Sequence, residues 1–393
     1  MIDYFKIQLT NFEPDLLLSN EELNFCSSVN RITGEIINVN KKGKPCIPHQ
    51  TAEYKNLTFK IYDTGSIYLS GSLHKYFNNG LHNYNDFSLK DIYNTIKDLE
   101  NRFKIDLKNC ILRGLEIGLN IIPPIDSNQI ITNSFLHKTK PLEWKFNSDE
   151  GKYKQCEHSQ YWIKLYNKAL HYSKQGYEIN NEILRFEIKF CKMEKLNKIG
   201  IFTLHDLMQK GFITHKKELL NQWDNILYFD ESINANTLQL KDFKNPDYWS
   251  RLIENDKKER FKKHRQQLRE LNQNSTGNTH QLIRTLLNDK YDELCQNTQI
   301  DTLCIRSNKV DRMCLITGFN ISMQKEQSRL LSHTGIKHYK EHHYKMYQQL
   351  EHKYLPKRWM NESIETRIKE IAHTIRNRFY CKRVDPLQLA ITF

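Results

Sequence analysis

Long hydrophobic runs and disulfide-type cysteine patterns are both missing from this sequence. No run of about 18 apolar residues occurs, which excludes a transmembrane helix of the usual length. Asp3 and Lys6 interrupt the apolar residues of the N-terminus, so it has no signal-peptide core. The nine cysteines are odd in number and include no C-x-x-C pair. These absences favour a cytoplasmic chain with reduced thiols.

Acidic residues are also fewer than basic ones. The chain has 46 acidic residues against 59 Lys and Arg, which gives a net charge of +13. A chain this basic is typical of proteins that bind polyanions, although a solvated basic surface is the simpler interpretation. An aromatic share of 11% favours folded cores over disorder. The length of 393 residues corresponds to about two or three domains.

The N-terminal half contains segments in which apolar and polar residues alternate, as in strands with one buried face. The expected strands and hairpin cover residues 3–9, 57–74, 111–122, 161–168 and 183–190. Helical spacing predicts helices over 88–103, where Ser88 suits the N-cap, and over 125–134. The predicted fold is α+β, with an antiparallel sheet that helices cover on one face and a charged open face.

Beyond residue 192 the apolar period becomes helical, and the C-terminal region is predicted to be mainly helical. The expected helices cover residues 204–208, 216–223, 248–271, 279–296, 335–353 and 362–379. A polar stretch over 272–278 has the composition of a linker. We therefore expect a sheet-based catalytic domain at 1–192, a helical basic region at 193–272 and a helical domain at 279–393.

The expected strand at 161–168 carries the most chemistry. Its alternation places Tyr166 on one face together with Lys164 and Lys168. A phenol has a pKa of about 10, and neighbouring cations lower it by stabilising the phenolate. Such a tyrosine could attack a phosphodiester. The alternative is a tyrosine that only packs at a sheet surface.

Two further strands have an isolated acid on the polar face, Glu116 in one and Glu187 in the other. Carboxylates are the ligands that hard divalent metals prefer. Arg185 and Lys189 flank Glu187, and we expect them to contact DNA phosphates or to pair with this acid. If the three strands share one sheet, Tyr166 and both glutamates converge on its open face. Solvated or ion-paired glutamates are the alternative.

Several stretches, taken in order over residues 1–210, resemble the gene II replication proteins of filamentous phages and the related phage and plasmid II/X family. The matching stretches are Met1-Ile-Asp3, Phe59-Lys-Ile-Tyr62, Gly80-Leu-His-Asn83, Leu115-Glu-Ile-Gly-Leu-Asn120, Leu165-Tyr-Asn-Lys168 and Leu184-Arg-Phe-Glu-Ile-Lys189. That family is related to the HUH endonucleases. Their His-hydrophobic-His metal motif does not occur in this sequence.

The resemblance implies a palm-like (RRM-like) sheet and a rolling-circle replication initiator. Such an enzyme nicks one strand at an origin, stays attached to the 5′ phosphate through tyrosine and later rejoins the strand. By similarity the tyrosine is Tyr166, with Lys168 beside it. Glu116, Glu187 and His82, with His74 as a rival to His82, would hold Mg²⁺ or Mn²⁺. Asn83 would position a phosphate.

The implied partners are single-stranded or supercoiled origin DNA, with a host helicase and polymerase. A basic run on the expected helix at 248–271 suits phosphate contacts, although such runs are usually solvated helix faces. Its DNA-binding candidates are Lys257, Lys258, Arg260, Lys262, Lys263 and Arg265. Lys164 is a further candidate on the sheet.

Two other functions stay open. A single-tyrosine transposase or relaxase would use the same chemistry. A basic DNA-binding protein without catalysis would explain the charge alone. Cys304, Cys314 and the histidines between 333 and 352 lack the spacing of a zinc knuckle, so a histidine-bearing helix is favoured there.

Overall fold

The computed structural model describes residues 1–27, 47–149, 151–234 and 238–296, and in the C-terminal part residues 312–313, 320–321, 348, 351–352, 355 and 360–376. The chain divides into two compact units, Met1–Ile300 and Asp301–Phe393. The expected boundaries at residues 192 and 272 do not coincide with this division. Cys304, Cys314 and most of the expected helix at 335–353 lie outside the described residues.

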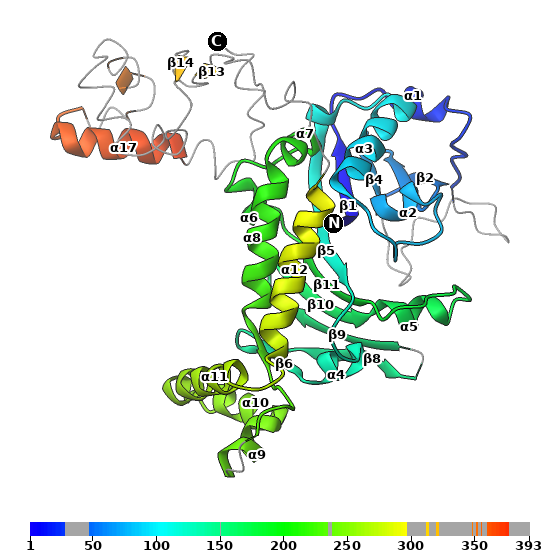
Figure 1. The fold of residues 1–393 in the computed structure, drawn as a ribbon. Coiled ribbons are helices and arrows are strands. Elements are labelled where there is room, and N and C mark those ends of the chain that lie inside the picture. Colours follow the sequence, from blue (N-terminus) through cyan, green and yellow to red (C-terminus); the bar gives the residue numbers. More distant parts are fainter. Residues whose placement is uncertain are drawn as a thin grey trace. The chain divides into compact units, whose positions relative to one another are not determined.

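The first unit is built on one large antiparallel sheet (Figure 1). Its strands are β1 (Ile2–Leu9), β2 (His49–Tyr54), β3 (Leu57–Tyr62), β4 (Ile67–Ser72), β5 (Cys110–Ile121), β8 (Glu143–Ser148), β9 (Gly151–Glu157), β10 (Tyr161–Asn167) and β11 (Leu184–Phe190). Their order in the sheet is β2-β3-β4-β1-β5-β11-β10-β9-β8. A small second sheet has the order β12-β6-β7, from β12 (Ile226–Tyr228), β6 (Ser134–His137) and β7 (Lys140–Pro141).

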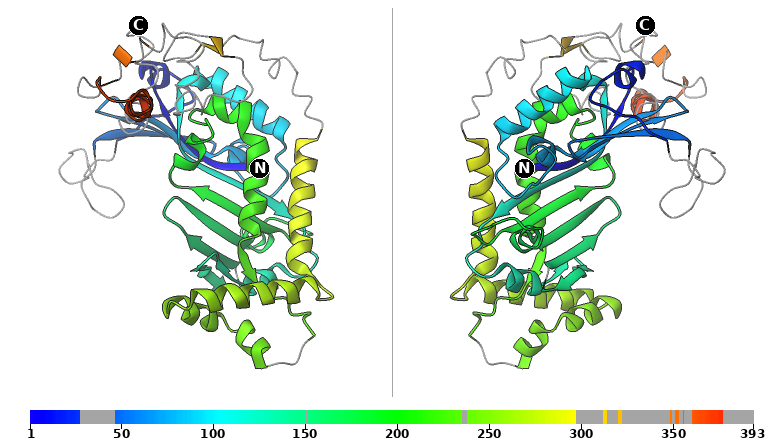
Figure 2. Two further views of the ribbon diagram at one scale, coloured as in Figure 1. Left: turned by 90° about the vertical axis from the view of Figure 1, so that its left-hand side faces the viewer. Right: turned by 90° about the vertical axis from the view of Figure 1, so that its right-hand side faces the viewer.

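Helices pack mainly on one face of the large sheet. The longer ones are α3 (Leu89–Phe103), α8 (Phe212–Trp223), α10 (Pro246–Glu254), α11 (Lys258–Gln273) and α12 (Thr279–Cys295). The shorter ones are α1 (Asp15–Leu18), α2 (Leu73–Phe77), η1 (Leu107–Asn109), α4 (Ser127–Thr132), α5 (Lys168–Ser173), α6 (Glu194–Asn197), α7 (Leu204–Asp206), η2 (Leu207–Gly211) and α9 (Leu238–Lys244). Figure 2 shows α8 and α12 along the same side of the strands, and both contact β5. The α+β prediction is confirmed.

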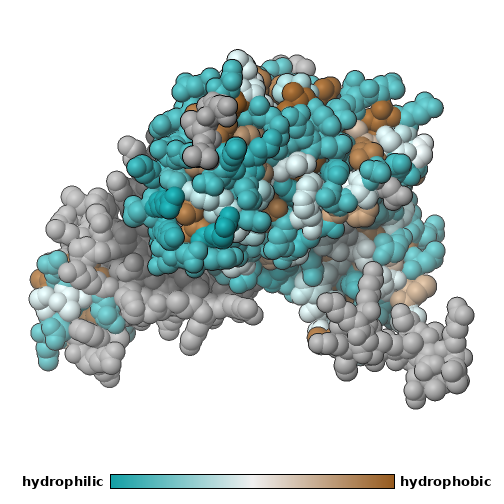
Figure 3. Space-filling view, turned by 90° about the horizontal axis from the view of Figure 1, so that it is seen from below, coloured by the Kyte–Doolittle hydropathy of each residue, from teal (hydrophilic) through white to brown (hydrophobic). Residues whose placement is uncertain are grey.

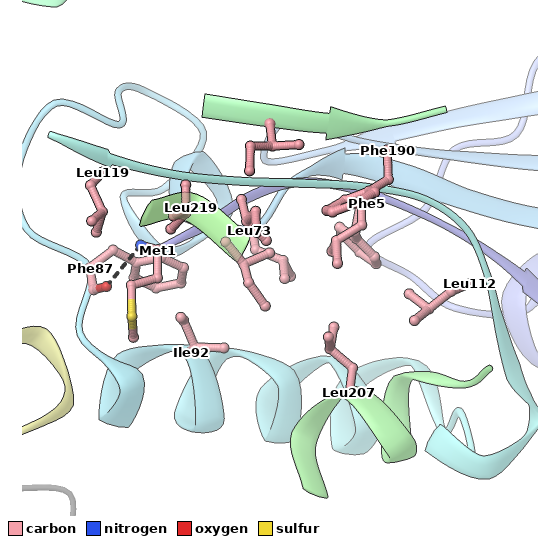
Figure 4. Close-up of a cluster of buried hydrophobic side chains, with 14 of the residues drawn as sticks. Met1, Phe5, Leu73, Phe87, Ile92, Leu112, Leu119, Phe190, Leu207 and Leu219 are labelled. Atoms are coloured by element: carbon pink, nitrogen blue, oxygen red, sulfur yellow. Dashed lines mark hydrogen bonds between the residues drawn. The ribbon is translucent and has the colours of Figure 1, made fainter. Parts of the chain in front are cut away.

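The core lies between this sheet face and the helices. Phe5 from β1, Ile92 from α3, Leu207 and Leu219 are buried in one continuous cluster (Figure 4). Ser88 begins α3 with a capping box, in which its hydroxyl accepts from the Asp91 amide and the Asp91 carboxylate accepts from the Ser88 amide. The apolar residues that recur at every second position of these strands are the ones that pack against the helices.

The structure differs from the sequence predictions at two positions that affect the site and the basic run. Lys168 was expected at the end of a strand, but it begins α5, because the Asn167 side chain caps the helix by accepting from the Leu170 amide at 2.9 Å. The expected helix at 248–271 breaks into α10 and α11, where Asp256 has a positive φ of 53°.

The second unit contains α17 (Ile364–Arg376) and the two short strands β13 (Arg312–Met313) and β14 (Asn320–Ile321). An ion pair of 3.0 Å joins Arg367 of α17 to Glu351. Across the parts of the chain that are described, no helix has both the length and the apolar content required to cross a membrane.

Candidate active site

Polar side chains gather on the face of the large sheet that lies opposite the helices. Strand pairing sets Lys164 of β10 across from Glu187 of β11, and Lys189 of β11 across from Glu116 of β5. Residues directly opposite each other on neighbouring strands point to the same face. Four charged residues from three strands are thereby brought together.

Lys164 bridges the two glutamates. Its Nζ lies 3.0 Å from Glu116 Oε1 and 2.6 Å from Glu187 Oε1. Tyr166, on the same strand face as Lys164, directs its hydroxyl at Glu187 Oε2, 3.4 Å away. The expectation that Tyr166, Glu116 and Glu187 share one face of the sheet is confirmed.

Arg185 forms the buried half of the network, with 2% of its side chain exposed. Its Nε donates to Glu187 Oε2 at 2.9 Å and its Nη2 donates to Asp3 Oδ2 at 3.3 Å. Its Nη1 donates to Asn120 Oδ1 at 3.0 Å. Arg185 is thus fully engaged with side chains of the protein, as the pairing alternative predicted, and its buried guanidinium is not free for phosphate.

Asp3 was missed as a site residue, although it stands in the first of the stretches that carry the resemblance. A register shift between Ile2 and Phe5 in the β1–β5 pairing changes the alternation of β1 at this point. Asp3 accepts from the Ser72 hydroxyl and from Asn83 Nδ2, the latter at 2.5 Å. Counting side-chain periodicity from the apolar residues of β1 therefore assigns Asp3 to the wrong side.

The network balances its own charge. Three carboxylates are paired with three cations: Asp3, Glu116 and Glu187 with Lys164, Arg185 and Lys189. Burial opposes the ionisation of Glu187, but Lys164 and Arg185 outweigh it and hold the pKa of Glu187 at about 2. Burial and the charge of Glu187 raise the pKa of Glu116. The face is polar but locally close to neutral.

Tyr166 is not activated in this arrangement. Burial, and then the negative charge of Glu187, raise its pKa well above the ordinary value. Lys168 does not act as the expected neighbouring cation, because it sits in α5 with 1% of its surface exposed. Burial and the charge of Arg185 depress the pKa of Lys168 strongly, and among the described residues its Nζ has no hydrogen-bond partner.

Asn83 and His82 do not take the positions that were expected of them. The Asn83 side chain is committed to Asp3 and to the Tyr172 hydroxyl, which donates to Asn83 Oδ1 at 2.7 Å. The His82 ring stacks on Tyr84 with 4.2 Å between ring centroids. His74, the rival ligand, stacks on Phe87 and hydrogen-bonds Asn85.

The expected metal-ligand set therefore does not assemble. Within the described ranges, the close groups of three or more potential ligands do not include Glu116, Glu187 and His82 together. The group that does occur is His137, Cys156 and His158, whose ligand atoms lie within 4.8 Å of one another. Sequence reasoning missed it because His137 is distant along the chain, and the only local signal is the Cys156-Glu-His158 spacing.

The basic run is largely exposed on α11. Lys257, Lys258, Arg260, Lys262 and Lys263 are exposed. Arg265 differs from them, since it is half-buried and its Nη2 donates to the Asn225 carbonyl at 3.1 Å, so its expected role in DNA binding finds no support. Helix α11 lies at the lower end of the first unit (Figure 1), and this end is mostly hydrophilic when seen from below (Figure 3).

Comparisons with known proteins do not assign the chain to a family. No family model matches the sequence, and no curated protein matches it. Among solved structures, the chain is similar to a rolling-circle replication initiator protein from Geobacillus stearothermophilus. The TM-score is 0.35 and the sequence identity 11%, and the alignment covers 65% of this chain and 95% of that chain.

Proposed function

We propose that this protein is a rolling-circle replication initiator that nicks one strand of origin DNA through Tyr166, holds the 5′ phosphate as a phosphotyrosyl ester and later rejoins the strand. The observation that carries the proposal is the position of Tyr166. Its hydroxyl points at Glu187 within a face that also presents Lys164 and Lys189. The family-like stretches identified in the sequence supply the strands of this face.

The proposed nicking step uses the side chains of Tyr166 and Glu187. The Tyr166 hydroxyl transfers its proton to Glu187 Oε2, the carboxylate oxygen 3.4 Å away. The phenolic oxygen then bonds to phosphorus while the bond from phosphorus to the 3′ oxygen breaks; that oxygen takes up a proton from the solvent, to which Glu187 returns the proton it accepted. Rejoining is the reverse reaction. The ester retains the energy of the phosphodiester, so no nucleotide triphosphate is consumed.

DNA itself would activate the tyrosine. In the free protein Lys164 and Arg185 keep the pKa of Glu187 at about 2, which makes this carboxylate a weak base. A phosphate that draws Lys164 away from Glu187 removes the leading cause of that depression. The basicity of Glu187 then rises at the moment when substrate is bound, and the proton of Tyr166 gains an acceptor.

Lys164 and Lys189 are the cations of the site that a phosphate can reach. Their side chains are 14% and 28% exposed, whereas Arg185 is 2% exposed. We assign phosphate contact to the two lysines and the positioning of Glu187 to Arg185. The exposed lysines and arginine of α11 add contacts to the DNA backbone that carry no base specificity.

Metal dependence, which the resemblance implies, does not fit the residues in this arrangement. A divalent cation requires oxygen ligands with negative charge to spare. Glu116 and Glu187 are both neutralised by cations of the protein, and His82 does not join them. The proposed steps therefore use only side chains of this chain.

The test is the covalent adduct. Full-length protein is mixed with a labelled library of single-stranded DNA, with EDTA or with Mn²⁺, and run on a denaturing gel. We expect an adduct that survives boiling, is lost in Tyr166→Phe and is retained in Tyr153→Phe. Tyr153 is a matched control because it lies opposite Tyr166 on β9, with 5.6 Å between ring centroids. Loss of the adduct in Tyr153→Phe alone would move the nucleophile to β9.

A second candidate function is DNA binding without catalysis. The raised pKa of Tyr166 and the self-neutralised network favour it, because both are expected of a polar group with a structural role. It predicts salt-sensitive binding and no adduct under either condition. A single-tyrosine transposase or relaxase would form the same adduct as an initiator, and sequencing the trapped DNA separates these two.

A further inference from the structure

A second cluster of reactive side chains lies in the first unit. His137 ends β6, Cys156 lies on β9 and His158 follows in the turn to β10. The His137 Nδ1 and His158 Nε2 atoms are 2.7 Å apart, and Cys156 Sγ lies 3.4 Å from His158 Nε2. Two imidazole nitrogens and a thiol sulfur thus converge on one point.

This cluster is separated from the Tyr166 site by the sheet itself. Cys156 lies opposite Ile163 in the β9–β10 pairing, and Ile163 is in the hydrophobic core. The next residue pair, Gln155 and Lys164, faces the polar side. Because neighbouring residues on a strand point to opposite faces, Cys156 lies on the helix-covered face. The cluster is therefore a site of its own and does not depend on the proposed nicking activity.

Two of the three separations can be compared with those of a tetrahedral zinc ion, and all three ligand atoms lie within 4.8 Å of one another. With Zn–N of about 2.05 Å and Zn–S of about 2.3 Å, tetrahedral angles place two nitrogen ligands about 3.3 Å apart and a nitrogen and a sulfur about 3.5 Å apart. The Cys156–His158 separation of 3.4 Å already meets this value. The His137–His158 separation of 2.7 Å must widen by about 0.6 Å, which a small rotation of the half-exposed His158 ring supplies.

The chemistry of the donors selects zinc over the hard cations. A thiolate with two imidazoles is a ligand set typical of Zn²⁺, whereas Mg²⁺ and Ca²⁺ take oxygen ligands. A neutral imidazole offers a nitrogen lone pair to the metal. A cysteine binds as the thiolate, so the Cys156 thiol would release its proton to the solvent when the metal binds.

The surroundings also favour metal ligation by His137 through Nδ1. Among the described residues, His137 Nε2 and Gln222 Oε1 are buried atoms without a hydrogen-bond partner. The Gln222 side chain is near enough to the His137 ring to raise its pKa, against the larger effect of burial. A metal at Nδ1 fixes the proton on Nε2, where an amide oxygen can accept it. Metal-bound histidines usually have an acceptor at their second nitrogen.

We propose that His137, Cys156 and His158 bind a zinc ion that fastens the small sheet to β9 of the large sheet, with water in the fourth position. His137 belongs to the small sheet and Cys156 to the large one, so the ion would link strands of two different sheets. The half-exposed His158 lies on the side from which water and metal reach the site.

Cobalt substitution tests the proposal on the full-length chain. After treatment with a chelator, Co²⁺ is titrated in and the absorption spectrum recorded. We expect one Co²⁺ per chain, ligand-field bands of tetrahedral strength and a thiolate-to-cobalt charge-transfer band, all displaced by Zn²⁺. Cys156→Ser loses the charge-transfer band. Cys191→Ser retains it, because Cys191 is an exposed cysteine outside the cluster.

A second measurement keeps the test decisive if Cys156→Ser does not fold. Zn²⁺ should raise the thermal midpoint of the wild type and of Cys191→Ser, and should leave that of His158→Gln unchanged. Absence of a charge-transfer band in the wild type overturns the proposal. So does a band that survives in folded Cys156→Ser, since it would assign the thiolate to another cysteine, such as Cys304 or Cys314.

Discussion

Lys164 and Glu187 lie opposite each other on β10 and β11, and their charged atoms are 2.6 Å apart. Glu187 is 3% exposed and Lys164 14% exposed, so this ion pair is largely removed from water. It joins the tyrosine strand to the strand that supplies the acid. The behaviour of the whole polar face depends on whether this pair is intact.

Removing the cation of this pair should destabilise the fold. Lys164→Met leaves Glu187 and Glu116 short of a buried partner, and breaking a buried ion pair in this way costs about 3–5 kcal/mol. We expect a lower urea midpoint, measured by circular dichroism. Lys262→Met is the control, because the exposed pair between Lys262 and Glu259 contributes less than about 1 kcal/mol. A loss in Lys164→Met no greater than in the control would contradict the prediction.

Gly118 makes room for the acid of the site. It lies opposite Glu187, and a Cβ atom at Gly118 would lie 2.6 Å from Glu187 Cβ and 2.7 Å from the Phe186 carbonyl oxygen. Gly118→Ala should therefore force β5 and β11 apart and cost about 1–3 kcal/mol. Gly114→Ala on the same strand meets its nearest atom at 3.4 Å and should cost less. Equal urea midpoints for the two variants would refute this explanation of Gly118.

Stability should fall in acid because of Glu187. The folded pKa of about 2 lies below the ordinary value of about 4.3. A depressed folded pKa contributes stability that is present above the unfolded pKa and is lost as the pH falls through the folded pKa. The loss should run from about pH 5 to pH 2. Glu116 has a raised pKa, so its contribution to stability increases as the pH falls, opposite to that of Glu187.

The measurement for this pH effect is the urea midpoint as a function of pH for the wild type and Glu187→Gln. The variant is less stable at pH 7, and its midpoint should depend less steeply on pH below 5. Parallel curves for the two proteins would assign the acid sensitivity to other carboxylates, Asp3 first among them, since its pKa is also lowered.

The basic surface of α11 should set the salt dependence of DNA binding. Each lost phosphate contact on single-stranded DNA reduces the slope of log affinity against log salt by about 0.7, so Lys262→Gln with Lys263→Gln should reduce it by about 1.4. The matched control is Lys90→Gln with Lys97→Gln, two exposed lysines of α3. An equal change in both pairs would mean that only net charge matters.

Alternation was a reliable guide to strands that bury several large apolar side chains against the helical layer, but it did not identify β9, which contributes Cys156 to the core. Phe5, Ile117, Ile163 and Ile188 are buried against the helical layer, and their strands were all predicted. Alternation also did not identify β8, which lies at the sheet edge and whose residues are almost all exposed. With no core to seal, an edge strand has no reason to alternate.

The site was predictable where it depends only on which face of the sheet each alternating residue points to. Tyr166, Glu116 and Glu187 were assigned correctly to one face because their strands run without interruption there. Asp3 was not, because the register shift in β1 is a property of pairing that a single sequence does not reveal. Lys168 was misplaced because the cap formed by Asn167 competes with continued alternation.

The β9–β10 pairing has a consequence for both proposed sites. A slip of β9 by one residue against β10 would turn Cys156 toward the polar face. An ion held by Cys156 would oppose such a slip, because the thiolate cannot leave the helix side without losing the metal. The cluster would then act as a lock on the register of β9, and the alignment of Tyr153 with Tyr166 would be preserved by chemistry on the opposite side of the sheet.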